Sequence, residues 1–391
     1  MNALPNVYGS LLVVRPPVPA TVNKAGANYK SEVTHLVYSP RRAYDEWLEI
    51  CEGILSFGGD AVFDFEPADD PLLDRGDLRV EGDGTLATVA GGERVGHMNE
   101  VLTGRVFAAN GPWVVVDGGM IRALLPNMLA HRVAEEAYYR GLLERMAEDA
   151  GCSLAVEKNP ARWEGMADVA PVVADGEAEG ASHVVLTYTT PGHYDADVGP
   201  KTMRSSREGV ERAADFAGVP PRARVFAELV YPHFHGDTVH FGARPPKSRG
   251  GGARLVHYPG GLYGGDAARV ASSLGAPSIV PIERDDAVEH YCGNSRQVEG
   301  GLLVPDAASE AFVGSMEGLG LRVRRVPLFE LFGKAGGGPA CATLYLPKNL
   351  ALSPKSPLRY SVRRDEARAR RERYAEKLLV DPHYFEGRAR G

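Results

Sequence analysis

The residue of this sequence best suited to chemistry is Cys341, which follows a run of glycines in GKAGGGPACATLYLP. Glycines allow close approach of the backbone and positive φ angles, so the thiol after them could lie exposed at the edge of a pocket, surrounded by backbone N–H groups. That environment suits a nucleophile. The alternative is a buried cysteine at the start of a core strand, where free cysteines are usually found.

A second group of reactive residues lies in YPHFHGDTVHF, which contains His233, His235, Asp237 and His240. His235 and Asp237 are two residues apart, so in an extended strand their side chains share one face. Histidine can transfer a proton near neutral pH, and a carboxylate beside it can hold a cation. A metal site is the alternative, because His233 lies on the same face. No cysteine or further histidine-rich segment completes a ligand set, so we expect no metal.

A pair of carboxylates, Glu164 and Asp168, flanks a glycine in ARWEGMADVAP. Carboxylates next to an aromatic residue can bind a planar cation through paired hydrogen bonds. Alone, such a pair is typical of a charged surface turn. Its significance depends on its combination with the other two groups.

The elements that must position these groups are those of an α/β fold, since short apolar runs, Gly/Pro breaks and helices alternate along the chain. The apolar runs predict strands at 11–15, 33–38, 61–65, 105–109, 113–117, 153–157, 183–188, 223–230, 238–241, 253–258, 278–282, 302–305, 321–327 and 342–347.

Three segments have the periodicity of amphipathic helices. The first begins at Ser39-Pro40, a cap followed by proline at the first helical position, and its predicted inner face is Tyr44, Trp47, Leu48, Cys51 and Leu55. The second runs through 131–151 with Gly151 as its stop, and its predicted inner face is Val133, Ala137, Tyr138, Leu142 and Met146. The third begins at Ser205, which has capping-box spacing to Glu208.

Composition excludes several classes of protein. The 391 residues carry a net charge of −7, with 44% hydrophobic and 24% charged residues, which is typical of a globular chain and not of a disordered one or a coiled coil. The net negative charge gives no overall excess of positive charge that would attract nucleic acid or an anionic membrane. No apolar stretch approaches the roughly 20 residues of a membrane-spanning helix. The four cysteines are far apart and form no CxxC pair, which predicts free thiols and a reducing compartment such as the cytoplasm.

We expect one catalytic domain over residues 1–350 and a C-terminal tail over 351–391 with a charged helix. The polar, turn-rich segment 66–95 predicts an inserted hairpin or surface excursion. The Gly/Pro-rich segment 245–265 is consistent with a linker or with a loop inside one domain. The tail helix, within 361–385, mixes both charge signs and is expected to pack through Tyr374, Leu378 and Leu379, with Glu366 supporting Arg370.

Six segments, in chain order, resemble the guanidine-modifying enzymes of the pentein superfamily: WEGMAD, RSSREGVERAADFAG, HFHGDTVHF, HYPGG, CGN and GGGPACATLYLP. That superfamily includes arginine deiminases, dimethylarginine dimethylaminohydrolases, succinylarginine dihydrolases and amidinotransferases. LLVVRPP resembles its first strand, and VFAANGPWVVVDGGMIRALLPNMLAHRVAEE resembles a passage that ends in Arg-x-x-Glu. The resemblance covers about residues 10 to 348 and lies in the order of the motifs.

The resemblance implies a fivefold pseudosymmetric α/β propeller with the active site at its centre and, in this chain, an added C-terminal helix. The sequence shows no clean internal repeat of its own. By the same match Cys341 is the nucleophile, His235 the general acid and base, and Glu164 and Asp237 bind the guanidinium. Asp168, from the same motif as Glu164, is a further candidate for substrate binding.

Two arginines and one asparagine complete the implied site. Arg204, in MRSS, matches an arginine that anchors a substrate carboxylate, and Arg132, in HRVAEE, matches a second. Many hydrolases of the superfamily have an aspartate where this chain has Asn110, in FAAN, so one contact to the guanidinium is expected to be neutral.

The implied reaction is hydrolysis of a guanidino group through a covalent thiouronium on Cys341, with no metal or organic cofactor. The GGGPAC passage resembles the succinylarginine dihydrolases and favours hydrolysis over amidino transfer, which is the alternative. A binding protein on the same fold and a zinc hydrolase built on His233, His235 and His240 are the other classes. The expected partner is a small guanidino compound, with no nucleic acid or membrane. Two roles are open for the tail: covering the site and forming a homo-oligomer.

Overall fold

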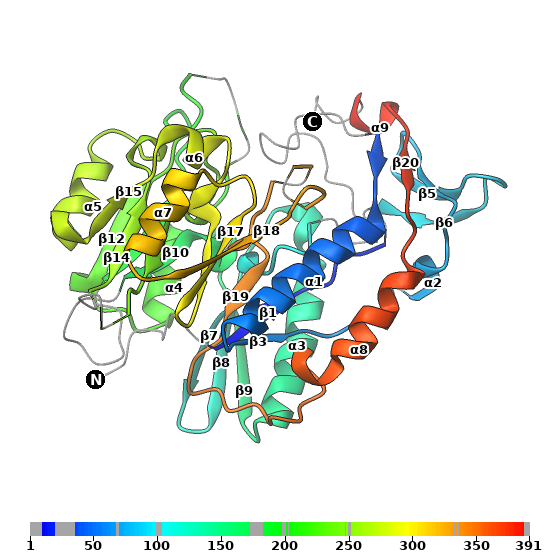
Figure 1. Ribbon diagram of the computed structural model, residues 1–391, viewed down its shortest axis with the longest axis horizontal. Helices are drawn as coiled ribbons and strands as arrows, with labels where there is room; N and C mark the ends of the chain where they lie inside the picture. Colours follow the sequence, from blue (N-terminus) through cyan, green and yellow to red (C-terminus); the bar gives the residue numbers. More distant parts are fainter. Residues whose placement is uncertain are drawn as a thin grey trace.

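Five small sheets of three strands each form the body of the computed structural model, which describes residues 10–19, 36–67, 70–98, 104–172, 183–197, 201, 203–246, 248, 252–331, 333–334 and 336–386 (Figure 1). Each sheet has the same arrangement: an antiparallel pair and a third strand that is parallel to the middle one and follows it through a helix. In four sheets the outer strand of the pair directly precedes the middle one in the chain, whereas in one sheet it is residues 343–345, far along the chain. Such parallel pairing requires a crossover, which the helix supplies. The fold is therefore mixed α/β, as predicted.

The five sheets and their crossover helices are as follows. The first contains β19 (Thr343–Tyr345), β1 (Leu11–Val14) and β3 (Asp60–Val62), with α1 (Pro40–Ser56). The second contains β7 (Trp113–Asp117), β8 (Met120–Leu125) and β9 (Ser153–Lys158), with α3 (Glu135–Asp149). The third contains β10 (Val169–Val172), β11 (His183–Tyr188) and β12 (Arg224–Glu228), with α4 (Arg207–Phe216). The fourth contains β13 (His240–Ala243), β14 (Arg254–His257) and β15 (Ile279–Pro281), with α5 (Asp266–Leu274). The fifth contains β16 (Arg296–Val298), β17 (Gly301–Pro305) and β18 (Arg322–Val326), with α7 (Glu310–Gly318), and the short α6 (Arg284–Val288) precedes it.

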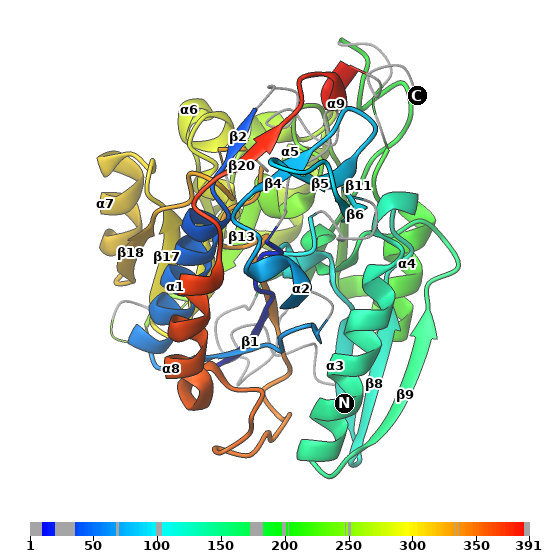
Figure 2. The ribbon, with the colours of Figure 1, turned by 90° about the vertical axis from the view of Figure 1, so that its right-hand side faces the viewer.

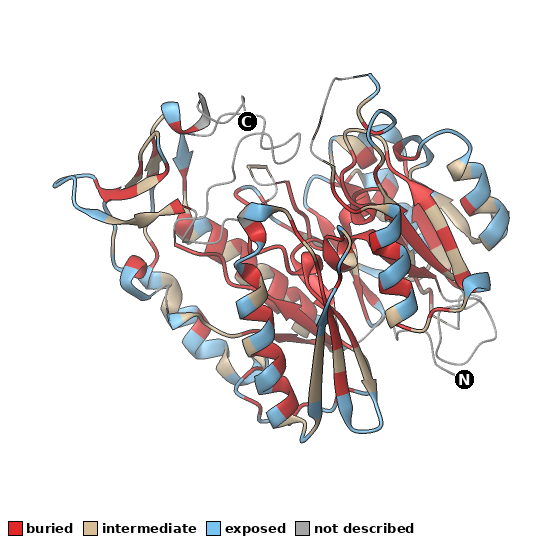
Figure 3. Ribbon diagram, turned by 180° about the vertical axis from the view of Figure 1, so that it is seen from behind, coloured by how far each residue is buried: buried red, intermediate tan, exposed pale blue. Residues whose placement is uncertain are grey.

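The helices cover the sheets with their apolar faces and expose the opposite faces (Figure 3). Helix α1 begins where the sequence predicts, because the Ser39 side chain accepts a hydrogen bond from the Arg42 N–H and Pro40 opens the first turn. Cys51 is buried on its inner face as expected. The thiols of all four cysteines are free, as the sequence predicts.

The predicted inner face of the second helix is partly wrong. Val133 is exposed, because a 3-10 turn precedes α3 and the helix starts only at Glu135. Ala137 is exposed as well, while Tyr139 and Leu143 are buried in its place.

The predicted cap of the third helix is also wrong. The N-cap of α4 is Ser206, whose side chain accepts from the Gly209 N–H, and not Ser205. The Ser205 hydroxyl binds Asp168 instead. The predicted strand over 105–109 is absent from that described stretch, which forms turns and a 3-10 helix (Ala108–Asn110).

Much of segment 66–95 joins the tail in a separate five-stranded sheet. Its strand order is β2 (Val37–Tyr38), β20 (Leu378–Val380), β4 (Leu78–Val80), β5 (Thr85–Thr88) and β6 (Arg94–His97), with α2 (Asp70–Leu73) beside it. Strand β20 comes from the tail and lies between β2 and β4 (Figure 2). In segment 245–265, β14 belongs to the fourth sheet, whereas residues 247 and 249–251 lie outside the described residues.

The tail packs along α1 through α8 (Tyr360–Arg370) and ends in α9 (His383–Glu386) (Figures 1 and 2). Tyr374 and Leu378 are buried as predicted, and the Tyr374 ring lies 4.4 Å from that of Tyr44. The predicted helix is too long, since β20 replaces its last part. Glu366 pairs with Arg363 and not with Arg370.

Most basic side chains of the tail form ion pairs with the body of the protein. These pairs are Arg363 with Asp64, Arg364 and Arg368 with Glu52, Arg370 with Asp70, Arg371 with Asp45, and Arg373 with Asp74. Among the residues that the structure describes, none of the helices combines the length and apolar character needed to cross a membrane.

Candidate active site

The candidate site is built from five turns, each of which shortly precedes the outer strand of the antiparallel pair in one sheet. Four of these turns are 3-10 helices and lead into β7, β10, β13 and β16, while the fifth leads into β19. Neighbouring turns contact one another. The residues that they carry at corresponding places are Asn110, Asp168, Asp237, Asn294 and Cys341. Side chains far apart in the sequence therefore meet in one cluster.

Cys341 lies buried at this meeting point, only 4% exposed, and is not at the edge of a pocket as the sequence suggested. Its Sγ lies 3.3 Å from Oδ2 of Asp237, to which the thiol donates a hydrogen bond. The side-chain amide of Asn294 donates to the same sulfur at 3.0 Å. Side chains, and not the expected backbone N–H groups, are thus the polar neighbours of the thiol.

The glycine run before Cys341 has the conformational role that was predicted. Gly336 has a φ of 79°, in the left-handed region that favours glycine. A Cβ on Gly337 would lie 2.1 Å from the Phe107 ring, and one on Gly338 would lie 2.9 Å from the Asn294 side-chain oxygen. Only residues without a side chain allow this approach.

His235 is held between two carboxylates. Its Nδ1 donates to Oδ2 of Asp168 at 3.0 Å, and its Nε2 lies 3.3 Å from Oε2 of Glu164. Burial by itself lowers the pKa of this imidazole, but the charges of Asp168 and Glu164 outweigh burial and raise it to about 9. At neutral pH the ring is therefore protonated and able to donate a proton.

Asp168 is fixed by a full set of donors. Its Oδ1 accepts from the Thr187 hydroxyl at 2.9 Å and from the Gly236 N–H at 3.0 Å, and its Oδ2 accepts from the Ser205 hydroxyl at 2.5 Å as well as from His235. The carboxylate is 1% exposed. This geometry suits the orientation of the imidazole and leaves little capacity for a substrate.

Glu164 is fully buried and remains charged. Burial raises its pKa, but the guanidinium of Arg204, with Nη1 at 3.0 Å from Oε2, and the nearby His235 lower the pKa well below its usual range. The chain turns sharply after it, since Gly165 has a φ of 87° and a Cβ there would lie 2.4 Å from the Asn110 backbone. The sequence Glu-Gly is thus needed to place the carboxylate beside the second sheet.

Asn110 lies between the imidazole and a buried ion pair. Its Nδ2 donates to the Glu164 carbonyl at 2.7 Å and lies 3.3 Å from Nε2 of His235. Its Oδ1 accepts from Nη1 of Arg132 at 2.5 Å. The other nitrogens of Arg132 bind Glu135 and the carbonyls of Gly104 and Phe107.

Arg132 therefore uses all three guanidinium nitrogens within the protein, where the sequence suggested a ligand for a substrate carboxylate. Arg204 binds one of the site carboxylates directly, with Nη1 at 3.0 Å from Oε2 of Glu164, and its guanidinium carbon lies 5.3 Å from the centre of the Phe234 ring.

Asp237 differs from the other carboxylates because part of it lacks a partner. Burial raises its pKa to about 6, although the positive charges of His235 and Arg296 lower it. Its Oδ1 is buried and has no hydrogen-bond partner among the described residues, whereas Oδ2 accepts from Cys341. Burial and the Asp237 charge raise the pKa of the Cys341 thiol, and the hydrogen bond from Asn294 lowers it.

His233 and His240, the other histidines of the alternative metal site, have different partners from His235. His233 binds the Thr238 hydroxyl at 3.2 Å, and the His240 ring faces that of His257 at 5.6 Å. Burial lowers the pKa of His233 and of His257 to about 4, so these rings are neutral. Within the described part of the chain, no three histidine, cysteine, aspartate or glutamate side chains are arranged to hold a metal ion.

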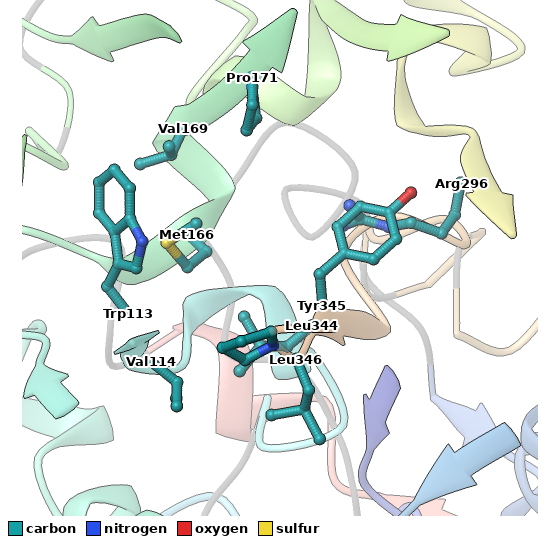
Figure 4. Close-up of a pocket in the computed structure, with 10 residues that line it drawn as sticks. Trp113, Val114, Met166, Val169, Pro171, Arg296, Leu344, Tyr345 and Leu346 are labelled. Carbon is teal, nitrogen blue, oxygen red and sulfur yellow. The ribbon is translucent and has the colours of Figure 1, made fainter. Parts of the chain in front are cut away.

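A cavity lies farther along the same strands, beyond the turns that carry the site. It is lined by Trp113, Val114, Met166, Val169, Pro171, Arg296, Leu344, Tyr345, Leu346 and Pro347 (Figure 4). A neighbouring pocket shares Arg296 and Tyr345 with it and reaches Asp237 and His240.

Sequence reasoning missed two residues of the site. Asn294 had appeared only as part of the CGN motif, and Ser205 only as a helix cap. Asn294 ends the 3-10 turn before β16 as Asn110 ends the one before β7, a signal that becomes readable once the strands are assigned. No local signal distinguishes Ser205 from a cap.

Comparison with known proteins identifies the fold. No model of a known protein family matches the sequence, and no curated protein sequence matches it. The structure superposes on the substrate-bound N-terminal domain of ArgZ, an arginine dihydrolase from the ornithine-ammonia cycle in cyanobacteria, with a TM-score of 0.60 and 20% identity over 85% of this chain and 97% of that one. For AgrE in complex with ornithine and NAD+ the TM-score is 0.58 and the identity 20%, over 85% of this chain and 39% of that one.

A third structure, DDAH from Pseudomonas aeruginosa complexed with citrulline, gives a TM-score of 0.54 and 14% identity over 87% of this chain and 100% of that chain. The present chain spans about 40% of the length of whole ArgZ. The resemblance to the guanidine-modifying enzymes of the pentein superfamily is thus confirmed at the level of the fold.

Proposed function

We propose that this protein hydrolyses the guanidino group of arginine or an arginine-like compound through a covalent intermediate on Cys341. The observation that carries the proposal is the cluster of turns, which brings the Cys341 thiol, the protonated His235 and the charged Glu164 together from three different sheets. A thiol, an acid/base group and carboxylates are the set that substitution at a guanidinium carbon requires.

Binding of the substrate falls to the carboxylates. A guanidinium is planar and binds carboxylates through paired, charge-assisted hydrogen bonds. Glu164 is charged, and Asp237, whose Oδ2 contacts the sulfur, has no hydrogen-bond partner for its Oδ1 among the residues that the structure describes. We propose that these two hold the guanidinium flat above Sγ of Cys341. The bound cation favours the thiolate, because burial alone opposes that form.

The first chemical step forms a bond from Sγ to the guanidinium carbon and gives a tetrahedral adduct. His235 then transfers its proton to the departing nitrogen, so that ammonia or an amine leaves and a thiouronium remains on the sulfur. The neutral imidazole next accepts a proton from water, whose oxygen attacks the same carbon. As the carbon–sulfur bond breaks, the remaining proton of the added hydroxyl passes to solvent, so that the neutral ureido product leaves and the thiolate is restored. The imidazolium was restored when the imidazole took its proton from water.

Other site residues act through these groups. We propose that Asp168 positions His235 and keeps it protonated, and that Arg132 positions Asn110. Arg204 is our candidate for the anchor of a substrate carboxylate, and in that role it would exchange its bond to Glu164 for one to the substrate. Asn110 would supply the neutral contact beside the carboxylates.

The neighbours in fold support hydrolysis, although fold by itself does not establish activity. One neighbour, ArgZ, is an arginine dihydrolase by name, and another is DDAH. A further structure is an asparagine-to-serine variant of ArgZ covalently bonded to a reaction intermediate. Amidino transfer differs only in the second step, in which an amine, and not water, attacks the carbon of the thiouronium. The five sheets of identical strand arrangement also support our proposal that they form a fivefold pseudosymmetric propeller around the site.

The test is mass-spectrometric product analysis of the purified protein with a panel of guanidino compounds, including arginine, a methylated and an acylated arginine, and agmatine. Each is incubated with and without an amine acceptor. A ureido or amino product with release of ammonia or an amine is expected, and it should vanish in Cys341→Ala but persist in the matched variant Cys152→Ala. Product formed only with the acceptor would establish transfer. Absence of both product and adduct on Cys341 would contradict catalysis.

A further inference from the structure

We propose that Asn294 is a positioning residue for the nucleophile, holding the sulfur of Cys341 in place and stabilising its thiolate. This inference rests on the proposed function, in which Cys341 attacks the substrate. Asn294 is the residue that the fifth sheet contributes to the cluster of turns, directly before β16. Its side chain is completely buried, at 0% exposure.

The amide of Asn294 binds Cys341 at two points. Oδ1 accepts from the Cys341 backbone N–H at 2.9 Å, and Nδ2 donates to Sγ at 3.0 Å. The backbone carbonyl of Asn294 also accepts from the Ala340 N–H at 2.9 Å. Three hydrogen bonds between one residue and two consecutive positions determine both where the nucleophile lies and which way its side chain points.

The same amide connects the nucleophile to the second carboxylate. Nδ2 donates to the backbone carbonyl of Asp237 at 2.9 Å, while the Asp237 side chain accepts from the thiol. Sγ therefore lies between a neutral donor and a carboxylate. The carboxylate favours the thiol, which can donate to it, and the amide favours the thiolate, which is the stronger acceptor. Asp237 and burial oppose ionisation of the Cys341 thiol, and the hydrogen bond from Asn294 counteracts both.

The surrounding backbone is shaped to admit this amide. A Cβ on Gly338 would lie 2.9 Å from Oδ1 of Asn294, and a Cβ on Gly293 would lie 2.6 Å from the Thr238 carbonyl. Glycines at both positions let the turn before β16 approach the turn before β13 and the segment that carries Cys341. An aspartate at 294 would have the same shape but would direct a carboxylate oxygen at the sulfur.

The experiment measures the rate at which iodoacetamide alkylates Cys341 as a function of pH, by peptide mass spectrometry on the whole protein. Because no guanidino substrate is needed, the result is independent of the proposed hydrolysis. Labelling of the half-buried Cys152 in the same samples is the internal reference, and Asn349→Ala, at an exposed asparagine, is the matched control.

We expect Asn294→Ala to move the midpoint of the profile to higher pH and to slow alkylation at fixed pH by about tenfold, the order of one hydrogen bond to a charged group. Asn294→Asp should move the midpoint further, since it replaces a donor by a negative charge. Asn349→Ala should match the wild type. If a guanidino substrate is found, Asn294→Ala should lower kcat and leave KM almost unchanged.

Unchanged midpoints in folded Asn294→Ala and Asn294→Asp would overturn the proposal, even if the wild type hydrolyses guanidino compounds. Shifted midpoints in a protein that hydrolyses none of them would leave the role of Asn294 intact and remove the proposed function. Thermal unfolding reports whether each variant folds. Asn294→Asp keeps the side-chain shape, so its alkylation profile is the one compared with the wild type if Asn294→Ala does not fold. Failure of both to fold would make Asn294 a structural residue and contradict the proposal.

Discussion

Asp168 lies directly behind His235, with its Oδ2 accepting a hydrogen bond from Nδ1 at 3.0 Å, so that the Nε2 edge of the ring faces Glu164 and Asn110. The two residues come from turns before different strands, β10 and β13. Their contact determines the orientation and the charge of the imidazole.

Replacement of Asp168 by asparagine should therefore alter catalysis through His235. Loss of the carboxylate charge lowers the pKa of His235 from about 9, so the proton needed by the leaving group is lost at lower pH. We expect kcat to fall about a hundredfold or more, the order of general acid catalysis. The alkaline limb of the kcat profile should move to lower pH, whereas an alkaline limb that stays in place would show that another group supplies the proton. Asp117→Asn, at the exposed end of β7, is the control.

Arg132→Met tests whether Arg132 binds substrate or protein. Its nitrogens bind Glu135, Asn110 and backbone carbonyls, so removal should lower the free energy of unfolding by about 3 kcal/mol, as for a buried ion pair that loses one partner. Urea unfolding measures this loss, with the exposed Arg212→Met as control. The ratio of kcat/KM for arginine and agmatine should remain that of the wild type. A selective loss for arginine would instead assign Arg132 to the substrate carboxylate.

Asn110→Ser should cause a covalent adduct to accumulate on Cys341. Asn110 lies 3.3 Å from Nε2 of His235, the nitrogen that must accept the proton of water in the second step. The shorter serine side chain cannot keep both this contact and the bond to Arg132. Intact-protein mass spectrometry after an acid quench during turnover should show the added mass in Asn110→Ser and little of it in the wild type or in Asn349→Ser. Equal adduct levels in all three would rule out a role in the second step.

The buried neutral histidines should make the protein sensitive to acid. Burial lowers the pKa of His257 to about 4 and that of His240 well below its usual value. Below the unfolded pKa, near 6.5, the unfolded chain binds protons that the folded chain does not, so stability is lost as pH falls. His257→Phe should make the free energy of unfolding fall less steeply between pH 6.5 and 4, by about 1.4 kcal/mol per pH unit. Urea titrations at several pH values measure the slope, and equal slopes in the wild type and His257→Phe would contradict this origin of the acid sensitivity.

The tail should contribute to stability and not to chemistry. The Tyr374 ring packs on Tyr44, and its hydroxyl donates to the Pro17 carbonyl at 2.8 Å. We expect Tyr374→Ala to cost about 3 to 5 kcal/mol of unfolding free energy, as for large aromatic truncations in a core. Val362→Ala, an exposed position in the same tail, should cost little. Activity per folded molecule should be unchanged in both, and a drop in that quantity for Tyr374→Ala would connect the tail to the site.

Residue type and motif order could be read from the chain because they depend on local chemistry. The glycines before Cys341, the cap and inner face of α1, and the alternation of strands and helices reflect backbone freedom and periodicity, which act over a few residues. The same signals led to the resemblance that the fold confirms. Where only local rules applied, as in the cap at Ser205, the prediction was wrong because a side chain from another turn, Asp168, competes for the hydroxyl.

The partners of the charged and polar groups depended on the tertiary structure. The sequence near Arg132 offers Glu135 three residues on, but it does not indicate that Asn110 and the Gly104 carbonyl also bind the guanidinium. Nothing near Asn294 places it against Cys341, 47 positions away. Burial of the thiol, the raised pKa of His235 and the choice of positioning residues all arise where turns from different sheets meet. The local sequence determines which groups a chain carries, whereas long-range packing determines which of them become neighbours and which charge they hold.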